Sequence, residues 1–162
     1  MKIKNLVINA LVAALYAVVT LMFPSFTAFQ FRLSEIFAHL PVFDKRYAPG
    51  LVLGVVVANL ASPFALFDVT FGTLHTAVSL LLMFVLTKGI KNIYLKLTIN
   101  TLIFSATSFI IALMILYFEP TGTAFWPIYF SVAVSIIVVM AIGIPIMVGL
   151  DKAINFSKQL DE

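Results

Sequence analysis

Long apolar runs separated by short polar stretches dominate the chain, and this pattern predicts helices that cross a lipid bilayer. A membrane-spanning helix needs roughly 20 mostly apolar residues, and four runs meet this criterion. Two further apolar segments lie between the first and the second of these runs. The expected helices cover residues 5–23, 31–43, 48–62, 69–87, 97–118 and 125–150.

The segment 31–43 is the least regular of the six, because it is apolar but carries Arg32, Glu35, His39 and Pro41. As an α-helix it would rise only about 20 Å, less than the roughly 30 Å of the hydrocarbon core. The basic residues nevertheless favour a crossing here, because without it five of them would move to the opposite side of the membrane. We therefore expect an all-α integral membrane protein, a single domain over residues 1–162, with six transmembrane helices and a short second helix packed inside the protein.

Nine of the ten basic residues lie in four short stretches. If the chain crosses the membrane six times, all four stretches lie on the same side. An excess of Lys and Arg marks cytoplasmic loops, so we expect both termini in the cytoplasm. Arg32 alone would lie on the outer side, together with Glu35, Asp68 and Glu119. The nine residues are Lys2, Lys4, Lys45, Arg46, Lys88, Lys91, Lys96, Lys152 and Lys158.

Composition leads to the same class of protein. With 62% hydrophobic residues, 10% charged residues and a mean hydropathy of +1.13, a chain of 162 residues cannot hide its apolar surface in a water-soluble fold. The net charge of +3 does not indicate a nucleic-acid partner, because the basic residues are scattered at helix ends. The basic start before an apolar run resembles a secretory signal, but the run is longer than a signal core and more spans follow, so we interpret it as the first helix.

Few residues suit catalysis or cofactor binding. There is no cysteine to form a disulfide, a thiolate nucleophile or a thiolate metal ligand, and there is no Walker A motif to hold ATP phosphates. The two histidines, His39 and His75, form no H-E-x-x-H pair, and their separation does not establish a metal site. We expect each to be a hydrogen-bonded packing or pocket residue, and we expect no metal and no cofactor.

Small residues form a stripe on the first expected helix. Ala10, Ala13, Ala14 and Ala17 lie at spacings of three and four residues, on one face. Small side chains let another helix approach closely, which is a main source of helix association in lipid. From spacing alone, the stripe serves either packing within the chain or contact with another subunit.

Ionisable residues near the outer ends of the expected helices are the first functional candidates. Such groups are costly in a membrane and usually face a cavity or a partner. Arg32 and Glu35 are three residues apart and share a face if the second helix begins there, while Asp68 lies just before the fourth helix. The alternatives are an interfacial ion pair of small net value, capping of a helix N-terminus by Asp68 and, for Glu119, a solvated loop position.

Aromatic and amide residues surround these charges in the sequence. Asn59 sits late in an apolar helix, where its amide requires a partner from a neighbouring helix or from a ligand. Aromatic residues near a membrane surface also form an interfacial belt, which is the alternative for Trp126. We expect a flat pocket, open to the outside, for a planar heterocycle with donor groups. Its candidate residues are Gln30, Phe31, Arg32, Glu35, Asn59, Phe67, Asp68 and Trp126.

Four segments of this region together resemble the QueT family, the substrate-binding S components of energy-coupling factor (ECF) transporters for queuosine precursors. The resemblance covers essentially the whole chain, whereas its specific motifs fall between residues 30 and 75. The segments are Gln30 to Glu35, Leu40 to Phe43, Gly50 to Pro63 and Phe67 to Thr73.

The resemblance implies a six-helix protein of the bacterial plasma membrane, not itself an enzyme, that captures a 7-deazaguanine compound such as aminomethyl-deazaguanine from outside. It also implies a partner module of one membrane coupling protein and two cytoplasmic ATPases, in line with the missing ATP motif. In such S components an A-x-x-x-A pattern on helix one contacts the coupling protein, and Ala10 with Ala14 and Ala13 with Ala17 fit it. Transport would proceed by toppling of the whole S component in the membrane.

The side-chain chemistry is compatible with such a ligand. One carboxylate, Glu35 or Asp68, can accept both the ring N–H and the exocyclic amine of a deazaguanine edge, while the other attracts the cationic aminomethyl group. Arg32 or Asn59 can donate to the ring carbonyl. Stacking on the rings would come from Phe31, Phe67 or Trp126.

Three other functions remain open from the sequence. A stand-alone secondary transporter would use Asp68, Glu35 or His75 as a proton relay, and its uptake would need a proton gradient and no ATPase. A small membrane enzyme would use the outer carboxylates as acid and base, and it would turn its ligand over. An S component for another vitamin would copurify with that vitamin.

Overall fold

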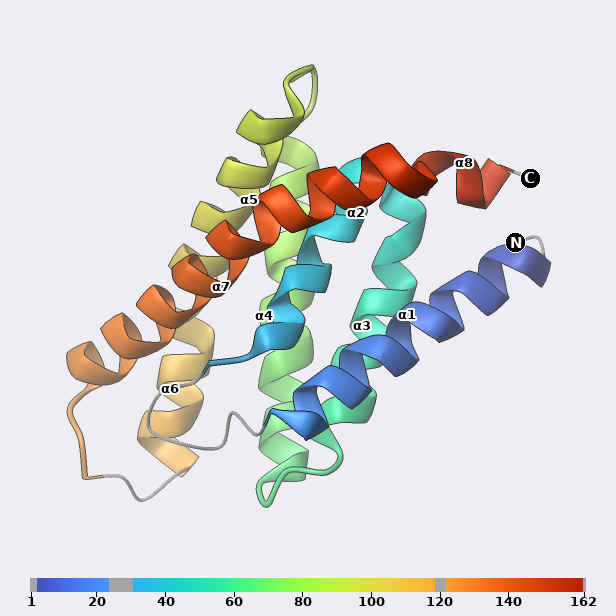
Figure 1. Cartoon of the computed structure of the whole chain (residues 1–162). Helices are drawn as coiled ribbons and strands as arrows, with labels where there is room; N and C mark the ends of the chain where they lie inside the picture. The colour runs from blue at the N-terminus through green and yellow to red at the C-terminus, as the bar shows by residue number, and fades with distance from the viewer. Residues whose placement is uncertain (1–2, 24–30, 119–121, 162) are drawn as a thin grey trace.

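Figure 1 shows the computed structural model of the chain, which describes residues 3–23, 31–118 and 122–161. Within these ranges the regular elements are all helical, so the predicted all-α class is confirmed. In chain order they are α1 (Ile3–Met22), the 3₁₀ helix η1 (Leu33–His39), α2 (Leu40–Phe43), the 3₁₀ helix η2 (Lys45–Tyr47), α3 (Ala48–Asn59), α4 (Ala65–Leu86), α5 (Ile93–Thr107), α6 (Phe109–Phe118), α7 (Phe125–Ile154) and α8 (Phe156–Asp161).

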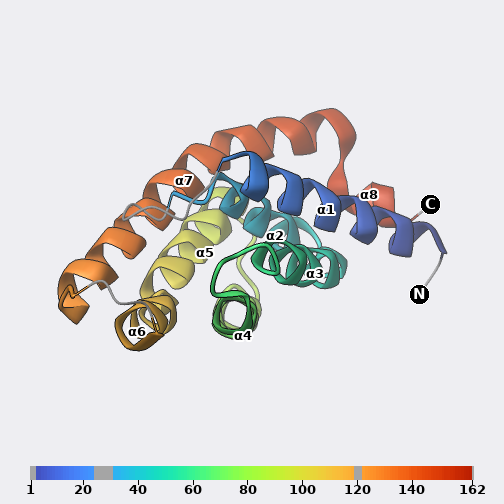
Figure 2. The same cartoon turned by 90° about the horizontal axis from the view of Figure 1, so that it is seen from below.

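Four helical stretches of the described chain are long and apolar enough to cross a membrane, as expected for an integral membrane protein. They are Ile3–Met22, Ala65–Leu86, Ile93–Phe118 and Phe125–Ile154. Seen from below, α1 and α7 lie along one side of the molecule and α3, α4 and α6 along the other, with α2 between them (Figure 2). The shorter η1–α2 segment therefore occupies the middle of the bundle.

The expected second helix is mostly 3₁₀, with α-helical geometry only over Leu40–Phe43. Together η1 and α2 rise about 20 Å. Hydrogen bonds to two other helices, α5 and α7, hold this segment in the interior. His39, which is fully buried, hydrogen-bonds the Met140 carbonyl of α7 through Nε2 at 3.0 Å, and Asn100 of α5 donates Nδ2–H to the Ala38 carbonyl at 3.0 Å. Gly143 of α7 allows the approach, because a Cβ there would lie 3.1 Å from Ile36.

Several helix boundaries differ from the expected ones. The helix α4 begins at Ala65 instead of residue 69, so Asp68 lies inside its first turn and not before it. The expected fifth helix begins at Ile93 and is divided at Ser108 into α5 and α6. Hydropathy marks the apolar core of a helix, whereas the ends depend on local hydrogen bonds, such as that from the Leu95 N–H to the Asn92 side chain at 3.2 Å.

The helices α1 and α3 pack closely through small residues. At Gly54 of α3, an added Cβ would lie 3.1 Å from the Cα of Ala13, so the two backbones meet directly. Ala13 and Ala17 are buried in this contact, with 5% of each exposed, whereas Ala10 and Ala14 are exposed. The four alanines of the predicted stripe thus form two rows, one turned into the chain and one turned outward.

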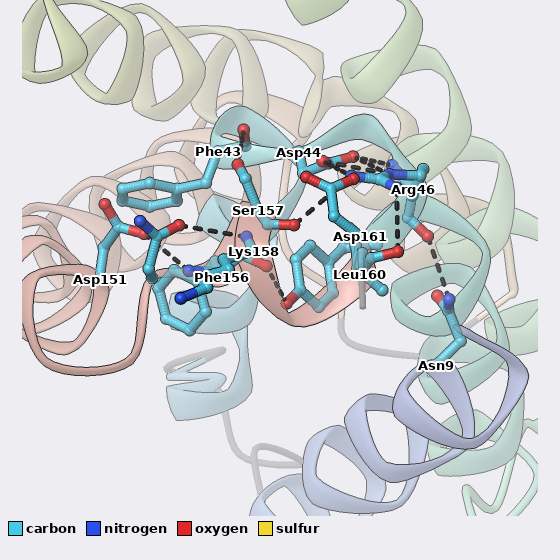
Figure 3. Close-up of polar contacts among 12 residues, drawn as sticks. Asn9, Phe43, Asp44, Arg46, Asp151, Phe156, Ser157, Lys158, Leu160 and Asp161 are labelled. Atoms are coloured by element: carbon cyan, nitrogen blue, oxygen red, sulfur yellow. Dashed lines mark hydrogen bonds and ion pairs between the residues drawn. The ribbon is translucent and has the colours of Figure 1, made fainter. Parts of the chain in front are cut away.

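The helix α8 contacts the segment just before α3, where Leu160 and Asp161 lie beside Arg46 (Figure 3). The Arg46 guanidinium lies 2.7 Å from carboxylate oxygens of both Asp44 and Asp161, and it donates to the Leu160 carbonyl at 3.0 Å. Hydrogen bonds from this guanidinium hold the pKa of the Asp44 carboxyl below its usual range. The Arg46 carbonyl accepts a hydrogen bond from Asn9 Nδ2 of α1 at 3.1 Å. One residue therefore joins α1, the start of α3 and α8.

Candidate functional site

Four of the predicted site residues form one polar cluster, made of Arg32, Glu35, Asn59 and Asp68. Arg32 precedes η1 and Glu35 lies in its first turn, Asn59 ends α3, and Asp68 lies in the first turn of α4. Arg32 donates from Nη1 to Asn59 Oδ1 at 3.3 Å, and its Nη2 lies 4.0 Å from Asp68 Oδ1. Both charged side chains are largely buried, with 13% and 8% exposed, so each stabilises the other in a place where a lone charge would be costly.

The turn between α3 and α4 fixes the Asp68 carboxylate in place. Ser62 donates its hydroxyl hydrogen to Asp68 Oδ2, and the Ser62 Oγ accepts from the Phe64 N–H at 3.1 Å. Asn59 donates from Nδ2 to the Asp68 carbonyl at 2.9 Å. The Asn59 amide thus has two partners, the Asp68 backbone carbonyl and the Arg32 guanidinium.

The Glu35 carboxylate takes its hydrogen bond from α1. Tyr16 donates its hydroxyl hydrogen to Glu35 Oε1 at 3.1 Å, and one turn later Thr20 donates to Ser34 Oγ at 2.6 Å. Sequence reasoning missed Tyr16. Its signal is a tyrosine and a threonine four residues apart on a helix that is otherwise apolar in this stretch.

A buried cavity of about 20 Å³ lies beside this cluster, with room for about one water molecule. Arg32 and Glu35 line it, whereas Asn59 and Asp68 do not. Within the cluster, Arg32 and Glu35 are therefore accessible from the cavity. Asn59 and Asp68 instead hold the Arg32 guanidinium in place. Its other lining residues are Val55, Gly72, His75, Thr76, Ile111, Val132 and Ile136.

Gly72 matters because it leaves space for the Asn59 side chain. A Cβ at this position would overlap Asn59 Nδ2. Gly72 and His75 lie on one face of α4, three residues apart. The sequence analysis predicted a packing or pocket role for His75, which lines the cavity, but it did not single out Gly72. The signal that points to them is a glycine, a histidine and a threonine on one face of an apolar helix.

The predicted aromatic residues do not gather at the cavity. The Phe67 ring stacks on Phe118, with centroids 4.1 Å apart, and does not line the cavity. Phe31 is 49% exposed and Trp126 is 62% exposed. Trp126 packs against Phe130 of its own helix, an arrangement that fits the interfacial belt. Gln30 and Glu119 lie outside the described residues.

Both histidines contact α5, and His39 also contacts α7. His39 links η1 to α5 and α7, and His75 bonds the Phe104 carbonyl of α5 at 3.0 Å. Within the described ranges, no group of three metal-ligating side chains comes together.

Known proteins similar to this chain are transporters. The sequence matches the family described as QueT transporter over residues 6–152. It is also similar to the queuosine precursor transporter QueT of Lactococcus lactis subsp. cremoris (strain MG1363), with 30% identity over 169 aligned positions that cover 97% of this chain and 98% of the relative. No solved structure gives a significant match.

Proposed function

Because this chain belongs to the QueT transporter family, we propose that it is the substrate-binding S component of an ECF importer and captures a queuosine precursor of the 7-deazaguanine type from outside the cell. The observation that carries this proposal is the Arg32–Glu35 pair, which presents a donor group and an acceptor group to one buried cavity. A planar heterocycle with a carbonyl beside an N–H and an amine needs this combination of partners.

Glu35 is the carboxylate that meets the ligand edge in this proposal. Its Oε1 accepts from Tyr16, while no described residue donates to Oε2. A deazaguanine edge offers a ring N–H and an exocyclic amine side by side, and Glu35 accepts them. Asp68 does not bind the ligand in this proposal, because its carboxylate oxygens already contact Ser62 and Arg32. Arg32, held by Asn59 and Asp68, donates to the ring carbonyl.

Ligand binding requires the cavity walls to move. A volume of about 20 Å³ is far below the roughly 300 Å³ of ordinary ligand pockets. Part of the cavity wall is apolar and includes Ile111, Val132 and Ile136. Displacement of such side chains breaks no hydrogen bond, so this wall is where the space opens and where the ring faces pack.

The membrane topology follows from the distribution of charge. The chain runs back and forth between the two ends of the bundle, with the shorter η1–α2 and α3 segments among the long helices (Figure 1). We take these passes as six crossings, with the Lys-rich end and both termini in the cytoplasm. Arg32 then lies at the outer end, where a ligand enters.

The exposed row of α1 is the surface for the coupling protein. Ala10 and Ala14 are exposed, and their small side chains would let another helix approach closely. A separate groove of about 390 Å³ lies between α1 and α7, and neither alanine lines it. Apolar side chains line it, among them Leu11, Leu15 and Leu150. The exposed alanine row supports docking of a coupling helix, and two cytoplasmic ATPases supply the energy. Ala13 and Ala17 are buried against α3 and contribute only by keeping α1 in place.

Binding to the purified protein tests the proposal. The ligand is 7-aminomethyl-7-deazaguanine, and calorimetry should detect saturable binding to the wild-type chain. Glu35→Gln should weaken binding by about ten- to hundredfold, the value of a hydrogen bond to a charged group. Asp151→Asn, a carboxylate change at the opposite end that keeps an acceptor for the Phe156 N–H, should have no effect. No binding to the wild type, or equal binding to Glu35→Gln, would contradict the assignment.

Uptake tests the transport class separately. In proteoliposomes that contain the chain with its coupling protein and ATPases, uptake should require ATP in the compartment that faces the ATPases. Uptake by the chain alone that collapses with a proton gradient would indicate the secondary transporter instead.

A further inference from the structure

His75 brings a second hydrogen-bond acceptor to the cavity, from a different helix than Glu35. It lies in the middle of α4, is only 3% exposed, and lines the cavity together with Arg32 and Glu35. Its Nε2 is 3.0 Å from the Phe104 carbonyl oxygen. The ring also meets the Phe104 ring edge to face, with centroids 5.5 Å apart. These contacts fix the orientation of the imidazole.

The partner of Nε2 determines the tautomer. A carbonyl oxygen only accepts hydrogen bonds, so Nε2 carries the hydrogen, and in the neutral imidazole Nδ1 carries a lone pair. No described residue hydrogen-bonds Nδ1. Thr76, the next residue, donates its hydroxyl hydrogen to the Gly72 carbonyl at 2.9 Å. Nδ1 is thus an acceptor on a nearly buried side chain at the cavity.

We infer that His75 Nδ1 accepts a hydrogen bond from the pyrrole N–H of the bound deazaguanine, so that the protein selects the free base over its N-substituted forms, nucleosides included. This inference rests on the proposed function. Arg32 and Glu35 come from one turn and hold one edge of the ligand, that of the six-membered ring. His75 reaches the cavity from α4 and meets the five-membered ring, whose nitrogen donates in the free base and carries a sugar in a nucleoside.

A purely structural role for His75 makes a different prediction. The Nε2 bond joins α4 to α5, but Ser79 and Thr107 join the same helices through hydroxyls 2.6 Å apart. If His75 served packing alone, its substitution would lower stability and leave the preference between ligands unchanged.

Two substitutions separate the two ring nitrogens. His75→Gln keeps an N–H donor near the position of Nε2 and removes the acceptor at Nδ1, whereas His75→Asn keeps an acceptor near Nδ1 and removes the donor. Binding of 7-aminomethyl-7-deazaguanine and of its pyrrole-N-methyl analogue is measured by calorimetry on each purified variant and on the wild type. Thermal unfolding without ligand reports the structural effect, and Ser79→Ala is the control for the α4–α5 contact.

The wild type should prefer the free base by about tenfold or more, the value of one hydrogen bond and of the space that the methyl group needs. His75→Gln should bind the free base about five- to tenfold more weakly and lose most of this preference, while His75→Asn should retain it. Ser79→Ala should keep the preference for the free base, whether or not it lowers the unfolding temperature. An unchanged preference in His75→Gln, with Glu35→Gln still defective, overturns this inference and leaves the proposed function standing. Failure of the wild type to bind either compound overturns both.

Discussion

Arg32 and Asp68 approach to 4.0 Å between Nη2 and Oδ1, yet only Arg32 lines the cavity. Ser62 donates a hydrogen bond to the Asp68 carboxylate. Asp68 therefore orients the Arg32 guanidinium and does not line the cavity. A charged pair that looks symmetrical in the sequence has one member at the cavity and one that supports it.

Asp68→Asn tests this division of roles. The amide can still accept from Ser62 but no longer balances the charge of Arg32, so unfolding should become easier by about 1–3 kcal/mol. Affinity for the deazaguanine should fall, but less than in Glu35→Gln. Thermal unfolding and calorimetry on the purified variants measure the two effects. An affinity loss as large as that of Glu35→Gln would mean that Asp68 touches the ligand.

Gly72→Ala should disturb the cluster from the α4 side. The new Cβ overlaps Asn59 Nδ2, so the Asn59 amide must leave the Asp68 carbonyl and its contact with Arg32. We expect weaker ligand binding and a lower unfolding temperature, because a buried amide loses its partners. Gly149→Ala is the matched control, since a Cβ there meets nothing within 4 Å. Equal behaviour of the two variants would contradict the tight fit at Gly72.

The two alanine rows of α1 should respond differently to enlargement. Ala14→Leu adds volume on the exposed row, so ligand binding should persist while copurification with the coupling protein is lost. Ala13→Leu adds volume against Gly54, where backbones already meet, and should destabilise the fold by about 1–3 kcal/mol. Pull-down with the coupling protein and thermal unfolding distinguish these effects. Normal assembly of Ala14→Leu would remove the exposed row from the interface.

The absence of cysteine makes the topology measurable with single-cysteine variants. Leu66 and Lys88 are exposed residues near the two ends of α4. A membrane-impermeant thiol reagent should label Leu66→Cys in intact cells, and Lys88→Cys only after the membrane is opened. The reverse pattern would invert the orientation, and labelling of both in intact cells would show that α4 does not span.

Acid should lower the stability of the fold, because the Asp44 carboxylate that pairs with Arg46 becomes protonated. The folded-state pKa of Asp44 is lowered by hydrogen bonds from Arg46, so the ionised carboxylate stabilises the fold above the usual Asp pKa of about 4. This contribution is lost as the pH falls from there through the lower folded-state pKa. Thermal unfolding between pH 6 and pH 3 should show the loss in the wild type and a smaller pH dependence in Asp44→Asn. Identical pH profiles would contradict the coupling.

Hydropathy and charge predicted the class and the long helices because burial in lipid is a property of whole segments. The 3₁₀ geometry of the η1 segment could not be predicted from the sequence. A 3₁₀ helix and an α-helix would bury similar residues here, and the choice depends on partners such as Asn100. The same holds for the α1 stripe. Helical spacing groups the alanines together, and only Gly54 of another helix decides which row is covered.

The charged residues of the site were predictable because ionisable groups in apolar segments need partners. Which of them faces the cavity was not, since Asp68 is engaged by a turn whose path the sequence does not reveal. Proximity in sequence to the charges was misleading for Phe31, which is exposed. A tertiary contact brought in Tyr16 from α1, which the sequence analysis missed. For His75 a packing or pocket role was predicted, but its place beside Arg32 and Glu35 was not.

The junction at Arg46 also has a consequence for biosynthesis. Ribosomes deliver the polypeptide from its first residue onward, and parts of a chain begin to fold as they emerge. Every residue that lines the cavity has been made by Ile136, whereas Leu160 and Asp161, which Arg46 binds, follow much later. A nascent chain therefore contains every residue of the cavity before Arg46 can join α1 to α8.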